Sequence, residues 1–150
     1  MAGLVAALIV GVGLWWSSPV SSGDVHRYVT EAARQQQIAL NDGSLVELNV
    51  SSDLSVKPTA GERRVTLAAG EAHFAVAHAM ARPFIVTAAG VSVLAVGTAF
   101  SVRLGETGVE VLVTEGRVEV ARDPVDAATS GGGRPKLGVG ERTLFYATNP

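Results

Sequence analysis

The chain has no cysteine, and this absence excludes disulfide bonds and metal sites that use thiolate ligands. Lysine occurs only at Lys57 and Lys136, and the formal net charge is -2. Nucleic-acid binding depends largely on cations that neutralise phosphates, so this composition does not favour a nucleic-acid partner. A small domain without disulfides must be stabilised by its hydrophobic core.

Clusters of basic residues are also missing, and Arg63-Arg64 is the one adjacent pair of cations. A phosphate clamp is one interpretation of such a pair. An isolated pair in a chain with scattered arginines is more typical of the exposed start of a strand. We therefore expect both arginine side chains at the surface.

With 150 residues, of which 47% are hydrophobic, the chain can form one modest domain with a core. We divide it into a hydrophobic helix over residues 1–16, a tether and leader over residues 17–37, and a β domain over residues 38–146. The tether is Ser-rich at first, and the leader shows no regular apolar pattern, so a short helical turn is one interpretation of it.

The first sixteen residues, MAGLVAALIVGVGLWW, carry no charge. As a helix they would span about 24 Å, against about 30 Å for the hydrocarbon core of a bilayer. Trp15 and Trp16 favour a membrane anchor, because aromatic residues concentrate at the membrane interface. A signal-peptide core is the alternative, although no basic residue precedes the run. A buried core helix is a third interpretation, and the missing polar stripe argues against it.

Residues 63–102 show the period-two pattern of strands with one buried face. The alternating apolar positions are Val65 and Leu67, then Ala72, Phe74 and Val76, then Phe84 and Val86, and finally Phe100 and Val102. Gly70, Pro83, Gly90 and Gly97 separate these runs and predict reversals or bulges. The order predicted is strand, turn, strand, loop, strand, turn, strand.

Further strands are predicted on both sides of this stretch. Asn41-Asp42-Gly43-Ser44 is a turn sequence inside a hairpin over residues 38–48, and a strand follows around Leu54 and Val56. Residues 105–108 form another turn. Residues 109–120 alternate on both sides of Glu115-Gly116 and predict a hairpin, as do residues 137–146 around Gly140. Residues 122–136 predict a loop; its three glycines lack the lysine of a phosphate-binding loop.

The chain resembles the FecR domain, a bacterial periplasmic module of transmembrane sensors and anti-sigma regulators, over about two thirds of its length. The central motifs of this resemblance are Arg64-Val65, Leu67, Gly70-Glu71-Ala72, Phe74, Val76, Arg82-Pro83-Phe84, Val86, Gly97-Thr98, Phe100 and Val102. The flanking motifs are Leu40-Asn41-Asp42-Gly43-Ser44, Val46, Leu48-Asn49, Ser52, Val111, Val113, Glu115-Gly116, Val118, Val120, Leu137 and Gly140-Glu141.

The resemblance implies a periplasmic sensor domain that acts by protein contact and relays an envelope signal, in some cases from iron transport, to a sigma factor. It implies an outer-membrane receptor or companion regulator as partner, and a single-pass location in the inner membrane. The family's sigma-binding cytoplasmic region is not in this sequence, so we expect an upstream start or a copy that has lost that half. An envelope scaffold or carbohydrate-binding module without signalling is the alternative.

Few residues suggest catalysis or metal binding. Asp42 has the pattern of a turn former that bonds its own backbone, with a metal ligand or general base as the alternative. His73 and His78 are five residues apart, so one continuous strand would point them to opposite faces, with His73 toward solvent. His26 lies in the leader. The histidines are therefore not expected to converge on a metal.

Glu71, Glu115 and Glu141 each stand beside a glycine at an expected reversal. This context indicates turn chemistry and edge protection more than a catalytic pair of carboxylates. At Gly97-Thr98 we expect a bulge or a close backbone approach. Aromatic residues for stacking on sugars are few, since Tyr28 and Tyr146 lie at the ends of the domain.

The sequence thus predicts an all-β domain of about ten short strands, wrapped as a compact sandwich or short solenoid-like roll and preceded by a hydrophobic helix. We expect no enzyme activity, no cofactor, and no catalytic or metal site. No motif in the sequence assigns particular residues to partner binding.

Overall fold

The computed structural model describes residues 24–122 and 134–147. These residues form twelve strands and no helix, which confirms the all-β prediction. The predicted helix over residues 1–16 and most of the predicted glycine-rich loop lie outside the described residues. Within the described ranges there is no helix long and apolar enough to cross a membrane.

The strands differ in length, and one of them is much longer than the rest. They are β1 (His26–Val29), β2 (Gln36–Ala39), β3 (Leu45–Leu48), β4 (Asp53–Pro58), β5 (Arg63–Ala75), β6 (Phe84–Ala88), β7 (Val91–Ala95), β8 (Ala99–Gly105), β9 (Gly108–Glu115), β10 (Arg117–Arg122), β11 (Lys136–Gly138) and β12 (Arg142–Tyr146).

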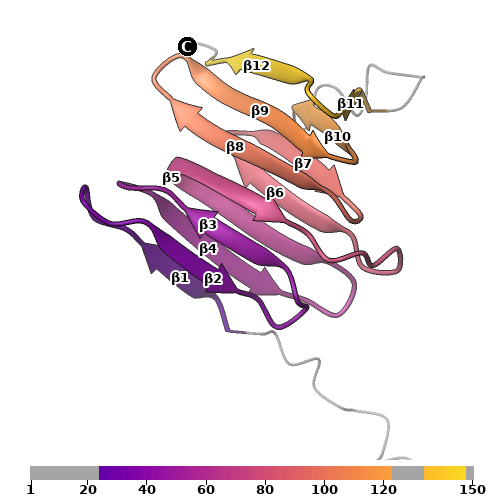
Figure 1. Cartoon of the computed structure of the whole chain (residues 1–150), viewed down its shortest axis with the longest axis horizontal. Helices are drawn as coiled ribbons and strands as arrows, with labels where there is room; N and C mark the ends of the chain where they lie inside the picture. Colours follow the sequence, from indigo (N-terminus) through magenta and orange to yellow (C-terminus); the bar gives the residue numbers. More distant parts are fainter. Residues whose placement is uncertain (1–23, 123–133, 148–150) are drawn as a thin grey trace, which may run out of the picture.

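The strands form two layers that share β5. Sheet A has the order β1-β4-β5-β6-β7-β10-β11, and sheet B has the order β2-β3-β5-β8-β9-β12. All pairings are antiparallel except that of β5 with β6. Figure 1 shows sheet B in front of sheet A. The predicted sandwich is therefore observed, with successive parts of the chain crossing between the layers.

The long strand β5 changes sheets at Gly70, where the sequence predicted a turn between two strands. Its first half pairs with β4 and β6, and its second half pairs with β3 and β8. Gly70 has a φ of 79°, and a register shift against β4 occurs beside it. Before the bend odd-numbered residues such as Leu67 are buried, and after it even-numbered ones such as Ala72 are. The sequence predicted either a reversal or a bulge at Gly70. The structure shows a bulge, so the prediction of a reversal is wrong.

Gly116 likewise carries the chain from sheet B to sheet A. The sequence predicted a hairpin over residues 109–120, but β9 pairs with β8 and β12, and β10 pairs with β7 and β11. The hairpin predicted around Gly140 is wrong for the same reason, because β11 and β12 belong to different sheets. Alternation shows that a strand has a buried face, but it does not identify the strand's neighbours.

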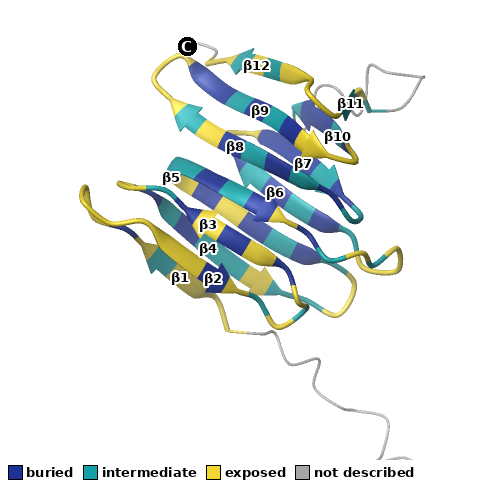
Figure 2. Cartoon of the chain, viewed as in Figure 1, coloured by how far each residue is buried: buried dark blue, intermediate teal, exposed yellow. Residues whose placement is uncertain are grey.

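Three phenylalanines occupy the centre of the core between the sheets. Phe74 and Phe100 of sheet B are stacked with ring centroids 5.3 Å apart, and Phe84 of sheet A lies 5.9 Å from Phe74. All three are fully buried. Such ring pairs add about 0.5–1.5 kcal/mol beyond the burial of their area. Figure 2 shows that buried positions alternate along most strands of both layers.

Two strands were not predicted, and both lack clear alternation. In β7 the consecutive residues Val91, Ser92 and Val93 are all buried, so no period is visible. In β1 three of four residues are exposed. The β structure thus begins at His26, inside the range predicted as tether and leader, because β1 pairs with β4. The turns over residues 41–44 and 105–108 connect adjacent strands as predicted.

Substitutions of three glycines by alanine test the bend in β5. A Cβ on Gly70 would lie 2.1 Å from Ser52 Oγ, whereas Gly90 has a similar positive φ and open space, and Gly61 has neither constraint. We expect Gly70→Ala to cost about 3 kcal/mol or more and Gly90→Ala about 1 kcal/mol, because only the first adds a steric clash to backbone strain. Gly61→Ala should change stability by less than about 0.5 kcal/mol. Equal losses at Gly70 and Gly90 in urea unfolding would contradict the role of the clash.

Candidate functional site

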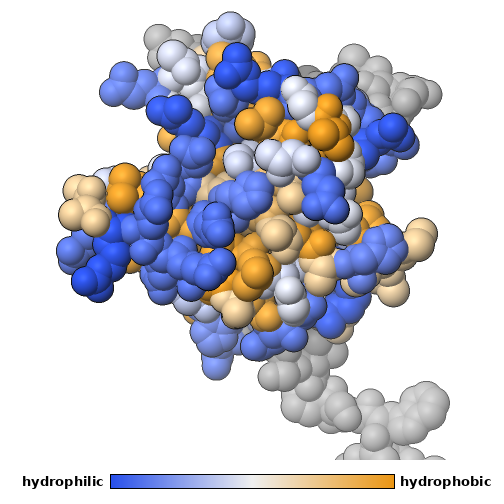
Figure 3. All heavy atoms as spheres, viewed as in Figure 1, coloured by the Kyte–Doolittle hydropathy of each residue, from blue (hydrophilic) through white to orange (hydrophobic). Residues whose placement is uncertain are grey.

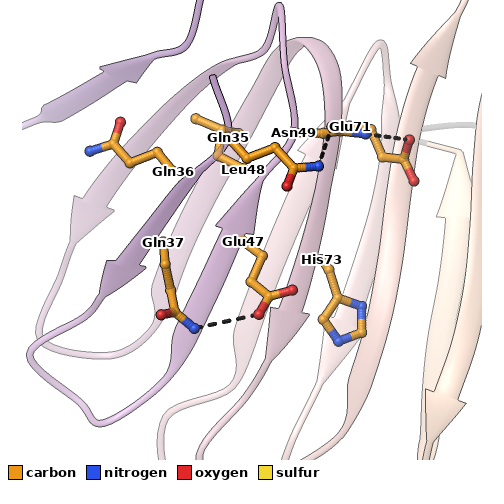
Figure 4. Close-up of a pocket in the computed structure, with 8 residues that line it drawn as sticks. All are labelled: Gln35, Gln36, Gln37, Glu47, Leu48, Asn49, Glu71 and His73. Carbon is orange, nitrogen blue, oxygen red and sulfur yellow. Dashed lines mark hydrogen bonds between the residues drawn. The ribbon is translucent and has the colours of Figure 1, made fainter. Parts of the chain in front are cut away.

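A polar groove lies on the outer face of sheet B, where β2, β3 and the second half of β5 are adjacent (Figure 4). Its volume is about 420 Å³. The residues that line it are Gln35, Gln36, Gln37, Glu47, Leu48, Asn49, Glu71 and His73. Figure 3 shows this face of the molecule, where hydrophilic residues dominate and smaller apolar patches lie between them.

The strand register brings the groove's side chains together. Gln37, Glu47 and His73 are direct neighbours across three strands. Gln37 Nε2 donates to Glu47 Oε1 at 3.4 Å, and His73 Nδ1 lies 3.0 Å from Ser101 Oγ on β8. Residues one position away, such as Val46 and Phe74, point into the core instead. The groove is therefore the polar side of strands whose other side is core.

A second row of polar side chains runs beside the first and ends at the bend in β5. Gln35 Nε2 donates to Asn49 Oδ1 at 3.0 Å, and Asn49 Nδ2 donates to Glu71 Oε2 at 3.3 Å. The backbone N–H of Glu71 donates to Ser52 Oγ at 2.9 Å. This row therefore connects β2 and β3 to the bend in β5 through polar side chains.

Glu47, His73 and Ser101 are neighbours on the adjacent strands β3, β5 and β8. Their side chains are of the types found in a hydrolytic triad. A triad requires the carboxylate to orient the imidazole, and the structure shows no hydrogen bond between Glu47 and His73. Pairing within the sheet also uses the backbone N–H groups that an oxyanion hole needs. Among the described residues, no group of three His, Cys, Asp or Glu is placed to hold a metal ion. The groove is suited to hydrogen bonding with a partner.

The structure does not bring the three histidines together. His73 lies in the groove, on the outer face as predicted, His26 is exposed on β1, and His78 is exposed after the end of β5. A Cβ on Gly97 would lie 2.5 Å from His78 Nδ1, which confirms the close approach expected at Gly97. Among the described residues the histidines therefore form no shared site.

The three glutamates beside glycines also occupy different places. Glu71 lies in the groove, Glu115 is exposed at the end of β9, and Glu141 accepts a hydrogen bond from the backbone N–H of Gly138. Glu141 thus has the turn role predicted for it. Sequence reasoning did not find the groove, because its signal, polar residues at outward positions of β2, β3 and β5, requires knowledge of the register.

Asp42 is a turn former, as predicted. Its Oδ1 accepts from the backbone N–H of Ser44 at 2.9 Å, and its Oδ2 accepts from Ser44 Oγ at 2.8 Å. It also forms an ion pair with Arg63 Nη1 at 2.5 Å. The turn between β2 and β3 is therefore attached to the start of β5.

The exposed position predicted for Arg63 is wrong, because this side chain is buried. Arg63 is 6% exposed, its Nε donates to the carbonyl of Arg82 at 2.9 Å, and its guanidinium lies over the ring of Phe84. Arg63 occupies an inward position of β5, whereas Arg64 faces outward and pairs with Glu62. The ion pair with Asp42 offsets part of the cost of burying the cation.

The environment of Asp42 changes its pKa. Burial raises the pKa of this carboxyl, but hydrogen bonds from Arg63 and Ser44 lower it more, so the pKa lies below its ordinary value. Because the folded pKa is below the unfolded one, the ionised carboxylate stabilises the fold fully above about pH 4. That contribution is lost as the pH falls through the lowered folded pKa.

Comparison with known proteins gives two kinds of match. The model of the family described as FecR protein matches residues 26–119. Two crystal structures of a "putative anti-sigma factor" from Parabacteroides distasonis superpose with TM-scores of 0.71 and 0.70, each at 26% identity over 83% of this chain. The present chain covers 56% of the length of each solved chain. No curated protein matches the sequence.

The buried ion pair can be tested by a double-mutant cycle. We expect Asp42→Asn to cost about 3 kcal/mol, because it leaves the buried cation of Arg63 uncompensated, and Arg63→Met to cost less, because the Asp42 carboxylate is partly exposed. The double variant should lose clearly less than the sum. When the pH is lowered from about 4 through the lowered pKa of Asp42, the Asp42→Asn variant should also lose less stability than the parent chain, because it has no carboxylate to protonate there. Urea unfolding across this pH range measures both effects.

Arg64→Met is the matched control for this cycle, because it removes a neighbouring cation from an exposed pair. Its cost should remain below about 1 kcal/mol. Additive losses for the two single variants, or an unchanged acid dependence in Asp42→Asn, would show that the pair does not stabilise the fold as described.

Proposed function

The chain belongs to the FecR protein family, and from this premise we propose that it is the periplasmic sensor domain of a transmembrane anti-sigma regulator. The observation that carries the proposal is the family match over residues 26–119, which extends from β1 into β10 and so includes most strands of both sheets. The likeness to solved structures described as an anti-sigma factor supports the same role.

The proposed mechanism is protein contact. In this proposal the β domain lies in the periplasm, held at the inner membrane by a hydrophobic helix over residues 1–16. An outer-membrane receptor, in some cases one for iron compounds, or a companion regulator binds the domain. The sigma factor is reached through a cytoplasmic region of the regulator and not through the β domain.

The groove on sheet B is the contact surface that we favour. Several of its amide and carboxylate side chains form hydrogen bonds with one another, so they present donors and acceptors side by side on one face. The strand β2 is also an edge strand of sheet B and borders the groove. A partner segment could therefore pair with the β2 backbone while its side chains contact the groove.

The alternative role, a scaffold or carbohydrate-binding module, has less support from this surface. None of the eight residues that line the groove is Phe, Tyr or Trp, the side chains whose large apolar rings stack on sugars. Tyr28 and Tyr146 belong to β1 and β12, away from the groove.

Site-specific photo-crosslinking tests the proposal. The full chain, carrying p-benzoylphenylalanine at Glu47 in the groove, would be expressed in the source bacterium and irradiated. The matched control is the same residue at Thr66, which is exposed on the outer face of sheet A. We expect an adduct with an outer-membrane receptor or a membrane-bound sigma regulator from position 47 and none from position 66, identified by mass spectrometry.

Adducts of equal yield from both positions would contradict the assignment of the groove. If both positions gave only cell-wall material, the regulatory role itself would fail for this chain, and the scaffold interpretation would replace it.

A further inference from the structure

A second cavity opens at the edge of the sandwich, where β1 and β2 both contribute to its lining. Its volume is about 250 Å³, and it extends between the inner side of sheet A and the turn that joins β2 to β3. Its accessible apolar wall consists of Val56, Tyr28 and Leu40, which are partly buried, and the fully buried Val65 and Phe84 also border it. The polar groove shares no lining residue with this cavity.

Arg63 lines this cavity and has hydrogen-bonding capacity left. Its Nη1 donates to Asp42 and to the carbonyl of Ala77, and its Nε donates to the carbonyl of Arg82. Its Nη2 is buried and has no hydrogen-bond partner among the protein atoms. A buried donor without a partner is unfavourable, so an acceptor supplied from outside the chain would be favoured here.

The charges around the cavity favour an anion. The residues that line the cavity include three cations, Arg63, Arg82 and Lys57, and one carboxylate. The whole chain, in contrast, has a formal net charge of -2. That carboxylate, on Asp42, already accepts hydrogen bonds from Ser44 and Arg63. The site therefore offers donors and positive charge, and few free acceptors.

We propose that this cavity binds a small organic carboxylate. The apolar body of the ligand packs against Val56, Tyr28 and Leu40, and its carboxylate lies at the cationic end near Arg63. A volume of about 250 Å³ lies below the usual range of ligand pockets, which restricts the body to about the size of one aromatic ring. This inference goes beyond the regulatory role and does not depend on any protein partner.

The probe for the test is 4-fluorophenylacetate, added to the full 150-residue chain and followed by fluorine NMR. We expect saturable binding with a dissociation constant on the order of 1 mM or tighter. The uncharged 4-fluorophenylacetamide has nearly the same shape and should bind at least tenfold more weakly. The absence of saturation, or equal binding of acid and amide, would overturn the proposal.

Two variants locate the site. Val56→Phe fills the cavity from β4 and should weaken binding at least tenfold, whereas Thr66→Phe places the same ring on the outer face of sheet A and should leave binding unchanged. Arg82→Gln removes an exposed cation that lines the cavity and should weaken binding severalfold. Thermal unfolding would verify that each variant is folded. If Val56→Phe does not fold, the affinity of Arg82→Gln decides the result. Full affinity in both folded variants would refute this site.

Discussion

The structure depends on one strand that belongs to two sheets. β5 pairs with β4 and β6 before Gly70 and with β3 and β8 after it, so both layers are built outward from the same backbone. This arrangement requires a residue that accepts a positive φ and has no Cβ, because Ser52 lies directly against the bend. Once β5 is bent in this way, the layers are held face to face and the three phenylalanines of the core can meet.

The two candidate binding regions are consequences of the same strand. The start of β5 turns Arg63 inward, where it pairs with Asp42 and lines the second cavity. The second half of β5 turns Glu71 and His73 outward into the polar groove. A ligand at the edge of the sandwich and a protein on the outer face of sheet B would therefore contact opposite ends of the same strand.

Membership of the FecR family and the outer groove lead to one functional interpretation. The groove presents hydrogen-bonded polar side chains but lacks the oriented base of a hydrolytic site, so it is suited to recognition. Burial of Arg63 is costly for a small domain, and the ion pair with Asp42 offsets only part of that cost. A cation kept inside such a core suggests a use beyond stability, which is the basis of the proposed carboxylate site.

The sequence by itself determined the class of fold and most of the buried positions. Period-two alternation at residues such as Val65, Phe74 and Val111 reflects a local rule, that neighbouring side chains of a strand point to opposite faces. The turn role of Asp42 was also predictable, because its bonds to Ser44 are local. The motifs shared with the FecR family were visible in the same way.

Only the tertiary structure decided which strands are neighbours and which polar residues meet. Gly70 and Gly116 marked irregular points in the sequence, but whether the chain reverses or crosses to the other sheet depends on partners far away along the chain. The inward position of Arg63 depends on Asp42 and Phe84, which are distant in sequence. The groove likewise exists only because the register places Glu47 beside His73, and register is a property of paired strands that a single strand does not contain.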